Sequence, residues 1–134
     1  MFFPVLRKLP CRSALMSLSL VLSQGLTPAA FAQTTAFTQS LAASASSDEA
    51  IAEWYRTTGY DTLWTGSDDA ARRAALLSAL STARDHGLPV TRYDVPTLVR
   101  DLRAAVTEGD RGRVEVAMTR AYLAWAHDLT SGAL

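Results

Sequence analysis

The stretch from residue 113 to residue 132 (RVEVAMTRAYLAWAHDLTSG) has an apolar pattern with the period of a helix. At about 100° per residue, one broad side of that helix collects large and small apolar residues: Val114, Ala117, Met118, Ala121, Tyr122, Trp125 and Leu129. The other side carries Val116 and Leu123 among polar residues. A helix with apolar residues on two sides packs between layers or offers one side to another domain. We therefore predict that this stretch is the central helix of the fold.

A shorter helical pattern lies near residues 47–58. Ser46 and Glu49 match a capping box, so the helix should begin at Ser46 or Ser47, and Gly59 is a natural stop. One side of this helix is predicted to carry Ile51, Trp54, Tyr55 and Thr58. The next five residues, 60–64 (YDTLW), are too short and aromatic for a helix. We expect an extended aromatic connector that folds back onto the core.

Two further helices are predicted before the central one. Ser67 is a candidate N-cap for the second helix, which should end in a Schellman motif at Gly87, followed by a proline. Asp94 is a candidate N-cap for the third helix, and Pro96 suits its first turn because it needs no hydrogen-bond donor there. Residues 108–110 (EGD) are interpreted as the turn into the central helix. No alternating strand pattern of useful length appears, so the predicted fold is all-α, a small bundle of about four helices.

The N-terminus has the three parts of a secretory signal peptide. A basic region with Arg7, Lys8 and Arg12 precedes an apolar run over residues 14–26, and residues 30–32 (AFA) match the small-x-small cleavage pattern. We predict cleavage after Ala32 and a periplasmic protein. The apolar run is shorter than the roughly 20 residues of a membrane span, so the only membrane attachment that we expect is through an uncleaved signal.

The predicted domain organisation follows from this signal. Residues 1–32 are the signal peptide, residues 33–47 form a flexible segment rich in Ala, Ser, Thr and Gln, and residues 48–134 form the helical domain. Removal of the signal takes three of the 13 basic residues and none of the 13 acidic ones, which leaves a net charge of about −3. An acidic domain of this kind argues against nucleic acid as a partner.

Candidate chemistry is sparse in the remaining chain. The only cysteine, Cys11, lies in the signal, so the domain has no thiol nucleophile or thiolate ligand. His86 suits a helix C-terminus and His127 lies on a polar side, and neither has partners at metal spacing. Asp68 and Asp69 are interpreted as a helix start rather than as a catalytic pair. We predict no catalytic residue, no metal site and no cofactor.

The aromatic residues suggest a second kind of site, because such rings can stack on sugars as well as fill a core. Most of them fall on predicted buried sides. Trp64 is the exception, since it lies on the connector before a glycine. The candidate contacts with glycan or a partner protein are therefore Trp64 and the two residues on the second side of the central helix, Val116 and Leu123.

Three motifs in order resemble the N-terminal scaffold domain of the large periplasmic murein L,D-transpeptidases. They are W-Y-R-x-x-G-Y-x-x-L-W-T (residues 54–65), H-G-L-P-x-x-x-Y-D (residues 86–94) and A-Y-L-x-W-A-x-D-L-x-S-G (residues 121–132). The resemblance covers roughly residues 50–134. It implies parent enzymes that cross-link peptidoglycan with a cysteine in a Ser-His-Gly-Cys type motif. That motif is missing here, as is the usual continuation with a proline beyond Ser131-Gly132, so we expect a domain truncated at its C-terminus.

Three functions follow as hypotheses. The first is a non-catalytic scaffold in an L,D-transpeptidase system, whose partner is a catalytic transpeptidase domain or another periplasmic protein. The second is a free-standing periplasmic module that binds peptidoglycan strands or a protein. The third is a hydrolase that relies on carboxylates and histidines alone, and it is the weakest because no candidate pair shares a helix face at suitable spacing.

Overall fold

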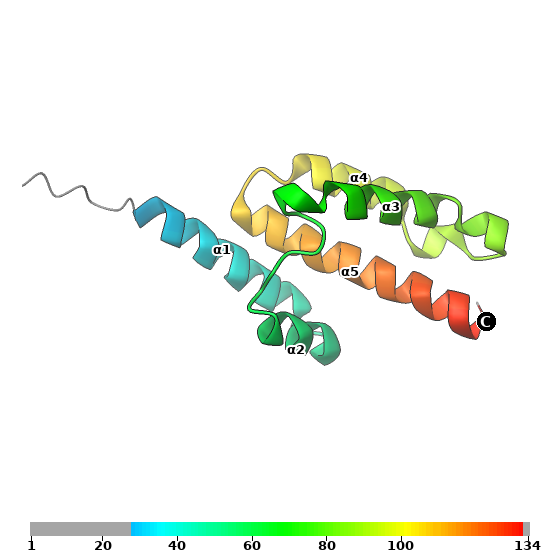
Figure 1. Cartoon of the computed structure of the whole chain (residues 1–134), viewed down its shortest axis with the longest axis horizontal. Coiled ribbons are helices and arrows are strands. Elements are labelled where there is room, and N and C mark those ends of the chain that lie inside the picture. The colour runs from blue at the N-terminus through cyan, green and yellow to red at the C-terminus, as the bar shows by residue number, and fades with distance from the viewer. Residues whose placement is uncertain (1–27, 133–134) are drawn as a thin grey trace, which may run out of the picture.

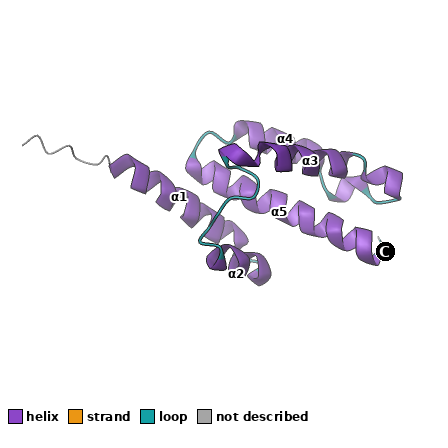
Figure 2. Cartoon of the chain, viewed as in Figure 1, coloured by secondary structure: helices purple, strands orange, loops and turns teal. Residues whose placement is uncertain are grey.

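The computed structural model describes residues 28–132, with side chains from residue 36 onward, and this part of the chain is helical (Figures 1 and 2). Its five α-helices are α1 (Pro28–Ala45), α2 (Glu49–Thr57), α3 (Ala70–Ser81), α4 (Val95–Ala104) and α5 (Glu108–Ser131). Short 3-10 helices at Ser67–Asp69, Ala83–His86 and Val90–Arg92 complete the order. The all-α prediction is confirmed. The predicted signal peptide lies mainly in residues 1–27, outside the described residues.

Helix α5 is the longest of these helices, and the others are arranged around it, as its two-sided pattern predicts. Helices α1 and α2 lie on one side of it, and α3 and α4 lie on the other (Figure 1). The larger core cluster, between α5 and the α3–α4 side, is built from Trp64, Leu76, Leu80, Ala83, Leu88, Tyr93, Leu98, Val114, Met118 and Ala121. The smaller cluster, on the other side, is built from Phe37, Leu41, Ala45, Ile51, Tyr55 and Val116. The central helix is therefore packed between two layers.

Helix α1 corrects the prediction of a flexible segment over residues 33–47. Phe37, Leu41 and Ala45 recur every fourth residue on one side of α1 and are 7%, 0% and 0% exposed. They pack with Val116 of α5. The small Ala and Ser residues between them look like a linker in composition, but they also allow two helices to approach closely.

Helix α1 approaches α5 closely at Gly112. A Cβ placed there would lie 2.7 Å from the carbonyl oxygen of Phe37 and 2.9 Å from the amide nitrogen of Leu41. Both atoms belong to the backbone and cannot turn aside. One turn earlier, the hydroxyl of Ser40 donates to the carbonyl of Gly109 at 2.7 Å. The contact between these helices thus depends on a residue without a side chain.

The start of α2 is shifted from its predicted position. Asp48 is the N-cap, and its carboxylate accepts from the N–H of Ile51 at 3.2 Å. The predicted cap at Ser46 or Ser47 is therefore wrong; the hydroxyl of Ser46 donates to the carbonyl of Ala43 near the end of α1. Asp and Ser are equally good caps, and sequence alone did not distinguish between adjacent candidates.

The region predicted as the second helix consists of α3 with a short 3-10 helix before it and another after it. Gly66, rather than the predicted Ser67, precedes the 3-10 turn, and α3 follows from Ala70. The predicted end is confirmed: Gly87 has a φ of 73°, and its N–H donates to the carbonyl of Arg84 at 2.9 Å. The N–H of Leu88 donates to the carbonyl of Ala83 at 3.1 Å. These two bonds form the predicted Schellman motif.

The caps of the last two helices give one confirmation and one correction. Asp94 caps α4 and accepts from the N–H of Thr97 at 3.4 Å, as predicted. Residues 108–110 are not a turn, because α5 begins at Glu108 with Thr107 as N-cap. Thr107 and Asp110 form a capping box, with bonds of 3.0 Å in each direction.

The predicted buried side of α5 is only partly buried. Val114, Met118 and Ala121 lie in the core, and Trp125 packs against it while partly exposed. Tyr122 and Leu129 are 40% and 44% exposed, which corrects their predicted burial. Among the helices of residues 28–132, none combines the length and hydropathy that a membrane crossing requires.

Candidate functional site

The first half of α5 carries a buried carboxylate, Glu115, which is 0% exposed. Its oxygens accept from the backbone N–H groups of Leu63 at 2.6 Å, Trp64 at 3.2 Å and Thr65 at 2.9 Å. They also accept from the hydroxyls of Thr65 at 2.7 Å and Tyr55 at 3.0 Å. Several donors compensate the burial of this charge. Glu115 therefore fixes the connector between α2 and α3 to the central helix.

Thr119, one turn further along α5, extends the same cluster. Its hydroxyl accepts from the indole N–H of Trp64 at 2.9 Å, lies 2.7 Å from the Tyr55 hydroxyl, and donates to the carbonyl of Glu115 at 3.0 Å. Burial raises the pKa of Tyr55 well above its ordinary value, and the charge of Glu115 adds to that shift while the Thr119 hydrogen bond opposes it. The phenol therefore stays protonated and can donate to the carboxylate.

The connector is also held through its carbonyl groups. The carbonyls of three consecutive residues each accept from an arginine side chain: Leu63 from Arg72, Trp64 from Arg73 and Thr65 from Arg111. The connector thus donates its N–H groups inward to Glu115 and presents its carbonyls to cations from α3 and α5. We call this arrangement, together with the Tyr55 and Thr119 hydroxyls that bond to Glu115 and to the Trp64 indole, the connector clamp. It satisfies an extended backbone that lacks a strand partner within residues 28–132.

The second half of α5 carries a second buried carboxylate, Asp128, which is 2% exposed. It accepts from Arg92 at 2.6 Å and from the hydroxyl of Tyr93 at 2.8 Å, and the imidazole of His127 lies 3.7 Å away. The Tyr93 hydrogen bond, followed by the Arg92 bond and charge, lowers the pKa of Asp128 against the opposing effect of burial. Burial and the bond to Asp128 raise the pKa of Tyr93 to about 12. Asp128 thus fixes the segment before α4 to α5.

These two clusters contain buried carboxylates, Glu115 and Asp128, that were not identified from the sequence. Glu115 lies three residues before Met118 and seven before Tyr122, so a carboxylate on the apolar side of the helix was the available signal. Both carboxylates accept hydrogen bonds from neighbouring segments and lie beneath the surface. Within residues 28–132, no three His, Cys, Asp or Glu side chains are grouped so that they could hold a metal ion. The arrangement can hold segments together, and it leaves neither carboxylate open to a substrate.

An apolar groove lies between α2 and α5. It has a volume of about 320 Å³ and is lined by Ala50, Ile51, Trp54, Leu63, Thr119, Tyr122 and Leu123. Trp54, Tyr122 and Leu123 are 39%, 40% and 44% exposed. The hydroxyl of Thr119 is already used in the connector clamp. The groove therefore offers apolar contact with few free polar groups.

The three predicted contact residues differ in exposure. Trp64 is 4% exposed and Val116 is 0% exposed, so neither presents a surface to glycan or protein. The hydrogen bond of the Trp64 indole to Thr119 draws that ring inward, and α1 covers Val116. Leu123 is the predicted contact that lies at the surface, and it lines the groove. The aromatic rings exposed at the groove are those of Trp54 and Tyr122.

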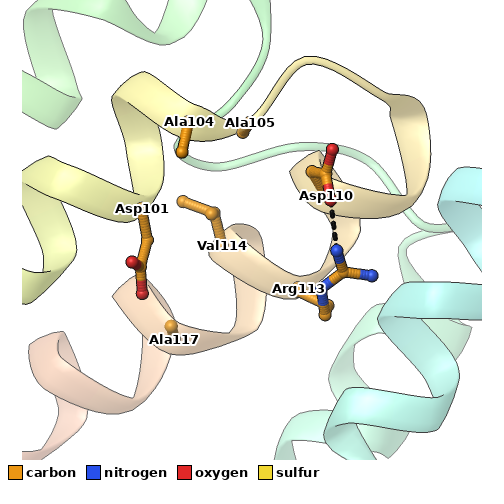
Figure 3. A pocket seen from close by; sticks show the side chains of 7 residues that line it. All are labelled: Asp101, Ala104, Ala105, Asp110, Arg113, Val114 and Ala117. Atoms are coloured by element: carbon orange, nitrogen blue, oxygen red, sulfur yellow. Dashed lines mark hydrogen bonds and ion pairs between the residues drawn. The ribbon is translucent and has the colours of Figure 1, made fainter.

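A second hollow, of about 390 Å³, lies between α4 and the start of α5 (Figure 3). Its charged residues are Asp101, Asp110 and Arg113, and Asp110 forms an ion pair with Arg113 (Figure 3). The Thr107 hydroxyl, which donates to Asp110 at 2.7 Å, is the main cause of the lowered pKa of Asp110. This carboxylate caps α5, so its role here is structural.

Comparison with known proteins agrees with the scaffold interpretation. Residues 49–134 match the family described as Scaffold domain, and this range begins with the first residue of α2. Neither a curated protein nor a solved structure matches the chain. The predicted scaffold domain is confirmed. Since the match covers well over half of the sequence, the chain belongs to the Scaffold domain family.

Proposed function

We propose that this protein is a non-catalytic helical scaffold in a peptidoglycan L,D-transpeptidase system, exported to the periplasm by its predicted signal peptide. Membership of the Scaffold domain family supports the scaffold role. The three motifs that resemble the N-terminal domain of murein L,D-transpeptidases support the link to cell-wall cross-linking. The partner in this proposal is a catalytic transpeptidase domain or another periplasmic protein.

The observation that carries the scaffold role is the use of the motif residues. Tyr55, Trp64 and Thr65 of the first motif meet in the connector clamp. Tyr93 of the second motif and Asp128 of the third bond to each other. The three motifs thus encode contacts that fix non-helical segments to α5. Side chains that hold a frame in one conformation preorganise a surface for a partner and do not require a reactive group.

We assign the catalytic step to the partner because this domain lacks the nucleophile. In the resembling enzymes a cysteine attacks an amide of the stem peptide, and the acyl group then passes to a neighbouring amine. The domain after residue 32 has no cysteine. A thiolate is the group that such acyl transfer needs. The chemistry therefore belongs to the partner, and this chain contributes shape.

An exchange assay tests the absence of catalysis. The purified protein is incubated with muropeptides and an acceptor amine, and the products are analysed by liquid chromatography and mass spectrometry. We expect no cross-linked or exchanged product, while an active L,D-transpeptidase in a parallel reaction yields both. Turnover that follows the protein through purification would contradict the proposal.

A second candidate function is glycan binding, which the exposed rings of Trp54 and Tyr122 favour. Aromatic rings can stack on sugars, but the groove has few free polar groups to bind the hydroxyls. A sedimentation assay with purified sacculi compares the protein with Trp54→Ala and with Val106→Ala, a change at an apolar residue 87% exposed outside the groove. Loss of binding in Trp54→Ala alone would favour this function. Equal retention of all three, or of none, counts against it.

A further inference from the structure

The side of α5 that α1 covers has the features of a binding site for a helix. Helix α1 lies beside the first half of α5 and runs in the same direction (Figure 1). Four α5 residues spaced three or four positions apart lie on this side: Gly109, Gly112, Val116 and Arg120. Gly112 leaves room for the backbone of α1, and Val116 packs with Phe37 and Leu41. We call these four residues, together with Ile51 and Tyr55 of α2, the α1-binding face.

Arg120 completes this face because it binds the C-terminal end of a helix. Its guanidinium donates to the carbonyl of Ser44 at 2.7 Å and to the hydroxyl of Ser47 at 2.9 Å. Helix α1 ends at Ala45, so the Ser44 carbonyl lies in its last turn. Carbonyls there have no partner within the helix and carry the negative end of its dipole. A cation at this position therefore stabilises a docked helix through its backbone, whatever its side chains.

Two observations distinguish α1 from the rest of the frame. The matched family range begins with the first residue of α2, so α1 lies outside it. The buried carboxylates of Glu115 and Asp128 fix other segments to α5, whereas residues 36–45 contain no charged residue. The side chains that these residues bury are those of Phe37, Leu41 and Ala45. Helix α1 is thus attached by a short apolar contact and a few hydrogen bonds.

The α1-binding face is supported independently of α1. Tyr55 bonds to Glu115 and lies 2.7 Å from the Thr119 hydroxyl, and both of these partners belong to α5. Val116 lies on α5 itself. The face should therefore keep its shape when α1 leaves, and a preformed site binds a helix without the cost of ordering the site.

We propose that the α1-binding face is a helix-docking site, which α1 occupies within the chain and which a partner helix of the same chemistry can occupy in its place. This inference goes beyond the proposed function and does not depend on it. The pattern of α1 defines the partner helix: it is uncharged, has large apolar residues four positions apart as at Phe37 and Leu41, and has a small residue such as Ser40 over Gly109. Its C-terminal end lies at Arg120. Release of α1 would then control access of the partner to the scaffold.

Exchange of α1 with an added peptide tests the site. A protease recognition sequence is inserted between Ser46 and Ser47, the purified protein is cut there, and a fluorescent peptide of residues 33–47 is the probe. We expect saturable binding to the cut protein and binding about tenfold or more weaker to the uncut protein, because a linked α1 has a high effective concentration. Equal binding to both would place the peptide elsewhere and contradict the proposal. A cut protein that loses its circular dichroism signal, or that does not take up the peptide, would overturn it.

Matched substitutions show whether the peptide lies on the α1-binding face. In the cut protein, Gly112→Ala should weaken peptide binding about tenfold through overpacking, because its Cβ would meet the backbone of the docked helix. Gly109→Ala is the control, since its Cβ would meet nothing closer than 3.7 Å. In the peptide, Leu41→Ala should weaken binding about tenfold or more, whereas Gln39→Ala, at an exposed position, should not. Equal binding of the two altered peptides would count against the site.

Hydrogen exchange tests the release of α1 in the uncut protein. Elements with few buried contacts open locally without unfolding of the whole domain. The amides of residues 36–45 should therefore exchange about tenfold or more faster than those of residues 112–120. Equal protection of the two segments would mean that α1 leaves only when the whole fold opens, and the proposal would fail.

Discussion

The first half of α5 is covered on two sides, whereas its second half is covered on one. In the first half, α1 packs at Gly112 and Val116, and Glu115 holds the connector. In the second half, Asp128 holds the segment before α4, while Tyr122 and Leu129 remain exposed. Both halves therefore use a buried carboxylate to fix a non-helical segment. They differ in what covers the remaining side of the helix.

This difference separates residues that stabilise the fold from residues that are free to bind. A buried carboxylate with several donors restricts the conformation of its partners, and removal of it leaves those donors unpaired. An exposed apolar side chain adds little to stability and is available for contact. The two halves of one helix thus combine a rigid frame with an open surface.

The largest effect is expected at Glu115. Glu115→Ala should lower the free energy of unfolding by about 3–5 kcal/mol, because it leaves buried N–H and hydroxyl donors without an acceptor. Glu115→Gln retains one acceptor oxygen and the side-chain volume, so it should be less damaging. Urea unfolding followed by circular dichroism measures both. If Glu115→Ala unfolds at the same urea concentration as the unaltered protein, the connector clamp does not stabilise the first half of α5.

The next effect concerns the contact of α1 with α5. Gly112→Ala places a Cβ within 2.9 Å of two backbone atoms of α1, at Phe37 and Leu41. We expect a loss of about 1–3 kcal/mol through overpacking. Gly109→Ala is the matched control in the same helix, since its Cβ would meet nothing closer than 3.7 Å. The control should be neutral or slightly stabilising because alanine favours a helix.

Limited proteolysis sharpens the interpretation of Gly112→Ala. If α1 is displaced from α5, cleavage within residues 36–45 should become faster in Gly112→Ala and remain slow in Gly109→Ala. Equal cleavage rates together with equal unfolding midpoints would mean that α1 does not depend on the close approach at Gly112.

A smaller effect distinguishes two residues that the sequence placed on the same side of α5. Val116 is 0% exposed and Leu123 is 44% exposed. Val116→Ala should cost about 1–2 kcal/mol through lost burial and a small cavity. Leu123→Ala should change the free energy of unfolding by less than about 0.5 kcal/mol. Urea unfolding of both variants measures the difference, and a reversed order would contradict the division of α5 into a covered and an open half.

Features that depend on a few neighbouring residues were predicted correctly where one candidate residue stood out, and wrongly at helix starts where adjacent residues were equally suitable caps. The Schellman motif at Gly87 and the cap at Asp94 were correctly predicted, because each is determined by a few residues in succession. Helix α1 was not predicted, since its contacts are with α5, about seventy residues away, and its composition resembles that of a linker. The apolar period of α5 indicated two buried sides. It did not show where along the helix each side becomes exposed.

The candidate site was predicted less completely than the fold. Of the three predicted contact residues, Leu123 is exposed, whereas Trp64 and Val116 are buried by partners that are distant in sequence. The role of Glu115 depends on backbone N–H groups of residues 63–65. Almost every residue has such a group, so the sequence does not show which ones bond to a distant carboxylate. Polar contacts between distant segments therefore need coordinates, even where the helices that carry them are evident.

The smallest expected effect is a change in the free energy of unfolding with pH, caused by the titration of Asp128 in the acidic range. The pKa of Asp128 is lower in the folded protein than the roughly 3.9 of an unfolded aspartate. The unfolded state therefore binds this proton first as the pH falls. The stability from Asp128 should be complete above about pH 4 and should decrease as the pH falls through the folded pKa. Asp128→Asn cannot titrate, so its unfolding midpoint should depend less on pH in this acidic range. Urea unfolding from about pH 7 to pH 3 measures both proteins, and parallel pH profiles would show that Asp128 does not couple the second half of α5 to protonation.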